Sequence, residues 1–183
     1  MSPEIQFSLE SKYTQQEGTI ILSGAQALVR LPLDQHLADK ARGLNTATFI
    51  SGYRGSPLGS LDFLLQQNQN ILRQHQVVFE PGVNEDLAAT AVFGSQLARL
   101  LEPKYDGVLG MWYGKGPGVD RTGDIFKHAQ IAGIGPHGGV LALAGDDPVA
   151  KSSTIPSHSE VALYDAQMPV LYPGNVQEVI DMG

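Results

Sequence analysis

The sequence predicts an α/β protein with an open, mostly parallel sheet and helices on both faces. Two observations favour this fold class. Short runs of β-branched and apolar residues alternate with stretches of helical length, which is typical of βαβ units. The 183 residues suffice for one domain with a full hydrophobic core but are too few for two domains of ordinary size. Function is then expected in the loops at the carboxyl ends of the strands.

The predicted strands and helices alternate along the whole chain. The first strand is TIILS (19–23), and the helix after it extends over 25–42 despite Pro32. Each later strand is a short run of strand-forming residues followed by a stretch of helical length. The later pairs are TATFIS (46–51) with 60–75, VVFE (77–80) with 84–101, GVLGMWY (107–113) with 122–133, GVLALAG (139–145) with 159–167, and PVLYPG (169–174) with 175–183.

The composition excludes several classes of protein. A net charge of −7 argues against a nucleic-acid or polybasic membrane surface, and no apolar stretch approaches the roughly 20 residues that span a bilayer. The absence of cysteine excludes disulfides and iron–sulfur clusters held by this chain. The first residues lack the features of a secretory signal, so a cytoplasmic location is expected. The five histidines show no metal-ligand spacing, and no G-x-S-x-G motif supports a serine hydrolase.

Three loops that follow predicted strands have compositions suited to ligand binding. In GYRGSPLGS (52–60) the glycines let a ligand approach the backbone, although an ordinary strand-to-helix turn would use the same residues. In EPGVNEDLAATA (80–91) Asn84 can cap a helix whose first turn is acidic, and the following helix face carries small residues that permit close packing. In YGKGPGVDRTGD (113–124) four glycines are costly to order, which favours more than a connecting role.

The stretch GDDPVAKSS (145–153) is similar to a phosphate-binding loop but departs from it at one glycine. Ala150 stands where the second glycine of the motif G-x-x-x-x-G-K-S belongs. Asp146 and Asp147 would repel a phosphate, and Pro148 has no amide hydrogen to donate. The loop is therefore predicted not to bind a nucleotide.

The sequence ends within a predicted helix. Asn175 can cap this helix, but its apolar positions Val176, Val179 and Ile180 have only begun to repeat when the sequence stops at Gly183. Two explanations remain open, a short terminal helix or a fragment of a longer chain.

Six long blocks occur in an order that resembles one known family. They are GAQALVRLPL, FISGYRGSPLG, PGVNEDLAATAVFGSQ, GMWYGKGPGVDRTGD, GGVLALAGDDPVAKSSTIPSHSE and PVLYPGNVQE. From about Gly18 onward the chain resembles the amino-terminal pyrimidine-binding domain of the thiamine-diphosphate-dependent 2-oxoacid:ferredoxin oxidoreductases, in particular the fused bacterial indolepyruvate ferredoxin oxidoreductases. The resemblance implies an N-terminal extension over 1–17 and a pyrimidine-binding domain over 18–183 that is truncated at its C-terminal end.

The resemblance implies a catalytic carboxylate. Thiamine diphosphate must lose the proton on C2 of its thiazolium ring, and enzymes that use it place a carboxylate against N1′ of the aminopyrimidine so that N4′ can remove this proton. Glu85 occupies the position of that carboxylate in this chain. Substrate contacts are expected of Arg54, which replaces a proline of the family pattern, and of Ser56, which falls where relatives carry threonine. The cofactor contacts expected besides Glu85 are Gly55, Ser56, Pro57, Met111 and Gly116.

The resemblance also implies a reaction and partners. An aryl 2-oxoacid such as indolepyruvate would react with coenzyme A and oxidised ferredoxin to give acyl-coenzyme A, carbon dioxide and reduced ferredoxin. Magnesium and the iron–sulfur clusters would belong to diphosphate-binding and oxidoreductase domains of the same longer polypeptide, and the intact enzyme is expected to be a homodimer. The chain alone is then expected to be inactive. The alternative is a non-catalytic nucleotide- or phosphate-binding α/β module.

Overall fold

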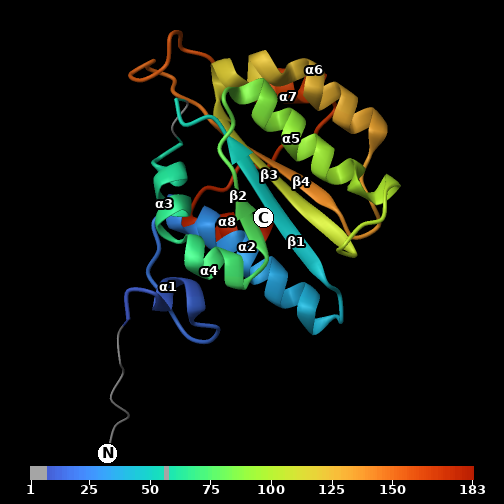
Figure 1. Cartoon of the computed structure of the whole chain (residues 1–183). Coiled ribbons are helices and arrows are strands. Elements are labelled where there is room, and N and C mark those ends of the chain that lie inside the picture. Colours follow the sequence, from blue (N-terminus) through green and yellow to red (C-terminus); the bar gives the residue numbers. More distant parts are fainter. Residues whose placement is uncertain (1–7, 56–57) are drawn as a thin grey trace, which may run out of the picture.

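The computed structural model describes residues 8–55 and 58–183, and in this part of the chain it contains one open sheet of four parallel strands. The strands pair in the order β2-β1-β3-β4 (Figure 1). Their bounds are β1 (Thr46–Gly52), β2 (Val77–Phe79), β3 (Gly107–Lys115) and β4 (Gly139–Gly145). The predicted class, an α/β fold with an open parallel sheet, is confirmed.

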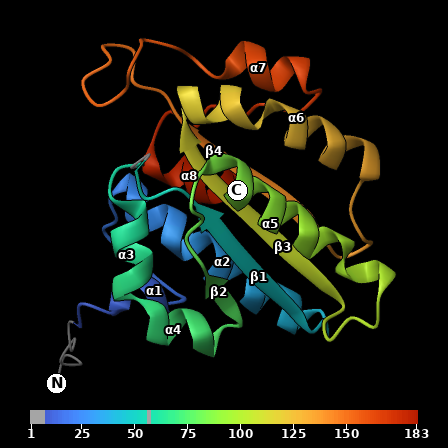
Figure 2. The same cartoon turned by 45° about the horizontal axis from the view of Figure 1, so that its top comes forward.

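Helices cover both faces of this sheet, as predicted (Figures 1 and 2). One face carries α2 (Gly24–Ala41), α3 (Leu61–Gln67), α4 (Gln69–Gln74) and the terminal α8 (Val176–Met182). The other face carries α5 (Glu85–Leu97), α6 (Gly116–Ala132) and α7 (Glu160–Asp165). The short helix α1 (Ser11–Thr14) packs against α2, and a 3-10 turn (Ala98–Leu100) follows α5.

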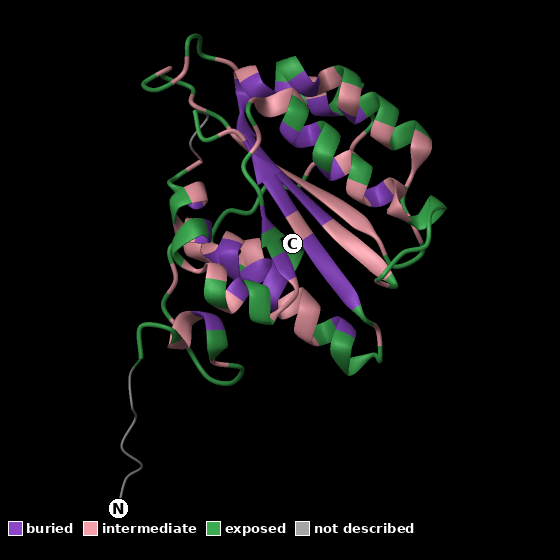
Figure 3. Cartoon of the chain, viewed as in Figure 1, coloured by how far each residue is buried: buried purple, intermediate pink, exposed green. Residues whose placement is uncertain are grey.

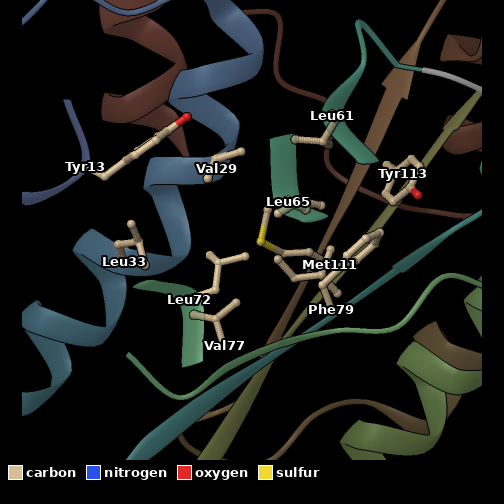
Figure 4. Packing of buried hydrophobic residues seen from close by; sticks show 11 residues of the cluster. Tyr13, Val29, Leu33, Leu61, Leu65, Leu72, Val77, Phe79, Met111 and Tyr113 are labelled. Carbon is tan, nitrogen blue, oxygen red and sulfur yellow. The ribbon is translucent and has the colours of Figure 1, made fainter. Parts of the chain in front are cut away.

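Each face has its own hydrophobic cluster. Strands β1 and β3 are buried over most of their length, whereas β4, at the sheet edge, is half-buried throughout (Figure 3). Burial of each large apolar side chain stabilises the fold by about 1.5–3 kcal/mol. The cluster under α2, α3 and α4 includes Val29, Leu33, Leu65, Phe79 and Met111 (Figure 4). The cluster under α5, α6 and α7 includes Val92, Trp112, Val119, Phe126 and Leu163.

The connections of β1 and β3 leave the sheet in opposite directions. From β1 the chain passes through α3 and α4 on one face to β2, and from β3 it passes through α6 on the other face to β4. The two connections run toward opposite edges of the sheet and lie on opposite faces of it. Both crossovers therefore have the same handedness. Ligands bind in α/β sheets at such a switch point, outside the carboxyl ends of the two strands. A ligand site is therefore expected at the loops after β1 and β3.

Two predicted strands are absent from the structure. The segment 19–23 has no strand pairing, and Ile21 is 90% exposed, because Ser23 instead begins α2 with a capping box in which Ser23 Oγ accepts from the amide of Gln26. The segment 169–174 is also irregular. Its two prolines, at 169 and 173, have no amide hydrogen for a ladder.

Helix boundaries differ from the predictions at two places. Helix α6 begins at Gly116, inside the stretch 113–124 that was predicted as a loop, because Pro117 in the first turn is compatible with a helix start. The predicted helix 60–75 divides at Asn68 into α3 and α4, and Asn68 donates a side-chain hydrogen bond back to the carbonyl of Leu64.

The described part of the predicted N-terminal extension packs on α2. Tyr13 is 3% exposed and belongs to the cluster under α2. Arg30 of α2 donates hydrogen bonds to the carbonyls of Lys12 (2.8 Å) and Gln15 (2.7 Å). This segment therefore packs on the domain through Tyr13 and through the carbonyls of Lys12 and Gln15. Among the described residues no helix combines the length and apolar character needed to cross a membrane.

Candidate functional site

The candidate site lies at the carboxyl ends of β1 and β3, where the first turns of α5 and α6 lie side by side (Figures 1 and 2). Asn84 caps α5 by accepting a hydrogen bond from the amide of Leu87 at 2.8 Å. The cap makes Glu85 the first residue of the helix, as predicted from the sequence. Buried Trp112 of β3 donates its Nε1 hydrogen to the carbonyl of Glu85 at 3.2 Å, which fixes this backbone position relative to the sheet.

The side chain of Glu85 lies against the backbone of α6 at Gly118. A β-carbon added to Gly118 would approach Cγ of Glu85 to 2.8 Å and its Oε1 to 3.3 Å, closer than side chains normally pack. Gly116, at the start of α6, is packed in the same way against Ser157, whose Oγ would lie 2.2 Å from an added β-carbon. The glycines of the stretch 113–124 therefore allow α6 to approach Glu85 and the segment after β4.

An ion pair joins the two helix starts beside Glu85. Arg121 Nε of α6 donates to Asp86 Oδ2 of α5 at 2.9 Å. The hydrogen bond to Asp86 raises the pKa of Arg121, and the negative charges of Asp86 and Glu85 act in the same direction. The second carboxylate oxygen of Asp86, Oδ1, is buried and has no hydrogen-bond partner in the described residues.

The loop after β1 contributes Tyr53, Arg54 and Gly55 to this edge. Tyr53 forms a parallel bridge with Gly82, so the chain after β2 continues alongside the end of β1. A β-carbon on Gly55 would overlap the ring of Tyr53 at 2.3 Å. Arg54 donates from Nη2 to Oε1 of Gln66 in α3 at 3.1 Å, on the face opposite Glu85. Ser56 and Pro57, which were predicted to touch cofactor and substrate, lie outside the described residues.

Met111 has no surface to offer a ligand in this chain. Its side chain is 1% exposed and belongs to the cluster under α2, α3 and α4, on the face opposite α5 (Figure 4). Further along the same strand, Tyr113 is fully buried and its ring fills the space left by Gly52, whose β-carbon would lie 2.4 Å from that ring. Burial raises the pKa of Tyr113, and its hydroxyl has no partner in the described residues.

The loop 145–153 is closed by its own carboxylate. Asp147 accepts hydrogen bonds from the amides of Lys151 (3.1 Å) and Ser152 (2.8 Å), which are the donors that a phosphate would need. The bond from the amide of Ser152 is the main cause that lowers the pKa of Asp147. No helix starts at Lys151, and buried Lys115 donates to the carbonyl and the hydroxyl of Ser152. The arrangement agrees with the prediction that this loop is not a nucleotide site.

Apart from Asp86, the solvent-exposed residues of α5 carry no charge. Val83, before the helix, is 79% exposed, and Leu87 is 53% exposed. Thr90, Ala91 and Gly94 continue this exposed face toward the end of the helix, and a β-carbon on Gly94 would meet nothing within 4 Å. A surface helix normally presents charged or polar residues to water. The face is therefore suited to being covered by another protein surface.

The histidines do not form a metal site in the described residues. His36 of α2 and His75, after α4, lie with their ring centroids 5.7 Å apart. They lie near the amino ends of β1 and β2, away from the candidate site. Burial lowers the pKa of His36, and the neighbouring His75 lowers it further. Among the described residues no three side chains of His, Asp or Glu are grouped to hold a metal ion.

Comparisons of the chain with protein-family models, with curated proteins and with solved structures found no match.

The sequence pointed to Glu85 but not to the residues that lie beside it in the structure. The roles of Gly118 and Arg121 depend on α6 lying beside α5, and the sequence stretch that contains both was predicted as a loop. Pro117 was the one signal in the sequence for the earlier start of α6, because proline is common in the first turn of a helix.

Proposed function

We propose that this chain is the pyrimidine-binding part of a thiamine-diphosphate enzyme that oxidatively decarboxylates aryl 2-oxoacids such as indolepyruvate. The proposed products are an acyl-coenzyme A and carbon dioxide, with the two electrons passed to ferredoxin. In this proposal the diphosphate group, its magnesium ion and the iron–sulfur clusters are held by other domains of a longer polypeptide, which acts as a homodimer. Because coenzyme A and ferredoxin are its co-substrates, the proposed location is the cytoplasm.

One observation carries the proposal: a glutamate carboxylate lies against a glycine of the neighbouring helix at the switch point of a parallel sheet. Glu85 is half-buried at the first position of α5, and Gly118 removes the β-carbon that would collide with it. An aminopyrimidine needs such a carboxylate for its N1′ atom. The place of Glu85 at the carboxyl ends of the strands supports the proposal.

When bound, thiamine diphosphate supplies a nucleophilic carbon that adds to the 2-oxo group and takes up the electrons left when carbon dioxide departs. Glu85 accepts a hydrogen bond from N1′ and stabilises the protonated form of that ring nitrogen. Asn84 and Trp112 hold Glu85 in position through the helix cap and through its carbonyl. Gly55 is exposed and can offer its backbone to the cofactor, whereas Gly116 is buried against Ser157 and offers none. Arg54 is a candidate for the substrate carboxylate.

The uncharged face of α5 supports the expectation that the site is shared with another domain or subunit. Leu87 and Val83, each two residues from Glu85 in the chain, are the exposed large apolar residues at this end of α5. No observation in the described residues favours the alternative of a phosphate-binding module, since Asp147 occupies the amides of the only loop that is similar to one.

The experiment that tests the proposal is a turnover assay of the intact protein with and without thiamine diphosphate. With indolepyruvate and coenzyme A, reduction of ferredoxin or a viologen dye is expected only when the cofactor and magnesium are present. The 183-residue chain alone is expected to give no reduction under the same conditions. Absence of cofactor-dependent reduction by the intact protein with any aryl 2-oxoacid, or full activity of the chain alone, would contradict the proposal.

A further inference from the structure

Tyr113, at the carboxyl end of β3, is a fully enclosed tyrosine whose hydroxyl is unpaired. Its side chain is 0% exposed, and among the described residues no group forms a hydrogen bond with the hydroxyl. Buried polar groups normally have a partner, because an unpaired group has lost its hydrogen bonds to water without replacement. The free chain therefore holds this hydroxyl in an arrangement that a hydrogen bond would stabilise.

The hydroxyl end of Tyr113 lies beside the end of β1. Tyr113 pairs with Gly52 in the last register position of β1 and β3, and its Cζ would lie 2.5 Å from a β-carbon on Gly52. Burial raises the pKa of Tyr113, the charge of Asp62 in α3 raises it further, and the charge of Arg54 lowers it. The hydroxyl therefore lies between α3 and the segment 53–55 that follows β1.

A partner for this hydroxyl has to come from the chain itself. Because Tyr113 is completely enclosed, no atom of a covering domain reaches the hydroxyl. The backbone of β1 is committed to the sheet, and the backbone of α3 is committed to its helix. The segment 53–55 forms a single bridge, between Tyr53 and Gly82, so it has backbone groups left to offer.

Other contacts hold the segment 53–55 in its present arrangement. Arg54 donates from Nη2 to Oε1 of Gln66 at 3.1 Å, and the ring of Tyr53 packs against Gly55. Gly55 is the residue of this segment that the proposed function places against the cofactor. A ligand shifts a segment toward the arrangement that it binds best, and a hydrogen bond gained by Tyr113 in that arrangement would add to the shift.

We propose that Tyr113 is a positioning residue: when the cofactor is bound, its hydroxyl forms a hydrogen bond with the backbone of 53–55 and holds Gly55 against the cofactor. The inference rests on the proposed function, since it names a residue that organises the same site. Tyr113 itself does not touch the cofactor, because it belongs to the cluster under α2, α3 and α4, on the face opposite Glu85.

The first test compares two buried tyrosines of the same cluster. Tyr13 is 3% exposed, and its hydroxyl has a hydrogen bond with the side chain of Asn68. Tyr13→Phe removes a paired hydroxyl and is expected to lower the melting temperature of the chain, whereas Tyr113→Phe removes an unpaired one and is expected to leave it unchanged or raise it. An equal fall in both variants would overturn the inference, because the hydroxyl of Tyr113 would then already have a partner, such as a buried water.

The second test measures the affinity for the cofactor. Calorimetry of the intact, cofactor-free protein with thiamine diphosphate and magnesium is expected to give a dissociation constant about 3- to 10-fold higher in Tyr113→Phe than in the parent, the effect of one hydrogen bond. Tyr13→Phe is expected to bind the cofactor as the parent does. Equal affinity of Tyr113→Phe and the parent would overturn the inference.

A spectroscopic measurement needs no substitution. In the intact protein with isotope-labelled tyrosine Cζ, the NMR signal of Tyr113 is expected to shift when thiamine diphosphate binds, because a hydrogen bond to the hydroxyl changes the shielding of the carbon that carries it. An unchanged signal in the protein saturated with cofactor would overturn the inference.

The outcomes separate this inference from the proposed function. Exchange of the C2 proton on the bound cofactor is expected to depend on Glu85, so Glu85→Gln tests the proposed function alone. If that exchange depends on Glu85 while Tyr113→Phe binds the cofactor as tightly as the parent, then only the inference about Tyr113 is wrong. If the intact protein binds no thiamine diphosphate, both are wrong.

Discussion

Gly118→Ala is expected to damage catalysis while leaving the fold intact. The added β-carbon would lie 2.8 Å from Cγ of Glu85, whereas ordinary contacts begin at 3.4 Å, so one side must move by at least about 0.6 Å. The side chain of Glu85 yields more easily than the backbone of two packed helices. Displacements near 1 Å at a reacting group cost on the order of 100-fold in rate. We therefore expect turnover of the intact protein to fall by about 10- to 100-fold.

The same substitution has the opposite effect on the helix itself. Alanine is favoured over glycine within a helix by about 0.5–1 kcal/mol, because it has less backbone freedom to lose on folding. This gain offsets part of the collision at Gly118, so the free energy of unfolding of the chain is expected to change by less than about 1 kcal/mol. Urea unfolding of the chain and turnover of the intact protein measure the two effects separately.

Gly123→Ala is the matched control on the same helix. A β-carbon at Gly123 would meet nothing within 4 Å. The substitution is expected to raise the free energy of unfolding by about 0.5–1 kcal/mol and to leave turnover unchanged. Equal turnover in Gly118→Ala and Gly123→Ala would contradict this prediction, since the close contact with Glu85 would then have no catalytic consequence.

Three further predictions concern other parts of the chain. Calorimetry is expected to detect no specific ATP or GTP binding to the loop 145–153, and micromolar binding that is lost in Lys151→Ala would contradict this. Gly94→Ala is expected to raise the melting temperature of the isolated chain, because a β-carbon at this position has open space. In the intact protein the same substitution is expected to weaken assembly, measured by analytical ultracentrifugation. Burial and the charge of His75 lower the pKa of His36, so the neutral form is favoured on folding. Stability is then fully present above the ordinary pKa of 6.5 and is lost as the pH falls through the lowered pKa of His36. Urea unfolding between about pH 7.5 and about pH 5 is expected to show a smaller loss in His36→Gln, and equal losses would refute the assignment.

The central strands and the start of α5 could be predicted from local sequence. The apolar runs that form β1, β3 and β4 are dictated by burial between two layers of helices. Asn84 determines the start of α5, and with it the position of Glu85, through a single local hydrogen bond.

The other features of the fold and of the candidate site depend on contacts between segments that are distant in the sequence. Residues 19–23 have the composition of a strand, but they pair with no strand, and Ser23 caps α2 instead. The density of glycine in 113–124 predicted a loop, whereas these glycines serve the close packing of α6 on Glu85 and Ser157. The pairing of Arg121 with Asp86 joins residues far apart in sequence, so no spacing rule could reveal it.

The most direct test of the proposed activation by Glu85 is the rate of C2-proton exchange on thiamine diphosphate bound to the intact protein, followed by NMR. Glutamine at position 85 keeps a hydrogen-bonding oxygen but cannot stabilise the protonated N1′, and removal of such assistance typically costs about 10²–10⁴-fold. Asp86→Asn removes the same helix-terminal charge from the next residue and is expected to have an effect of less than about 10-fold. Exchange in Glu85→Gln is expected to be slower than in the parent by at least about 100-fold. Exchange within a few-fold of the parent would contradict it.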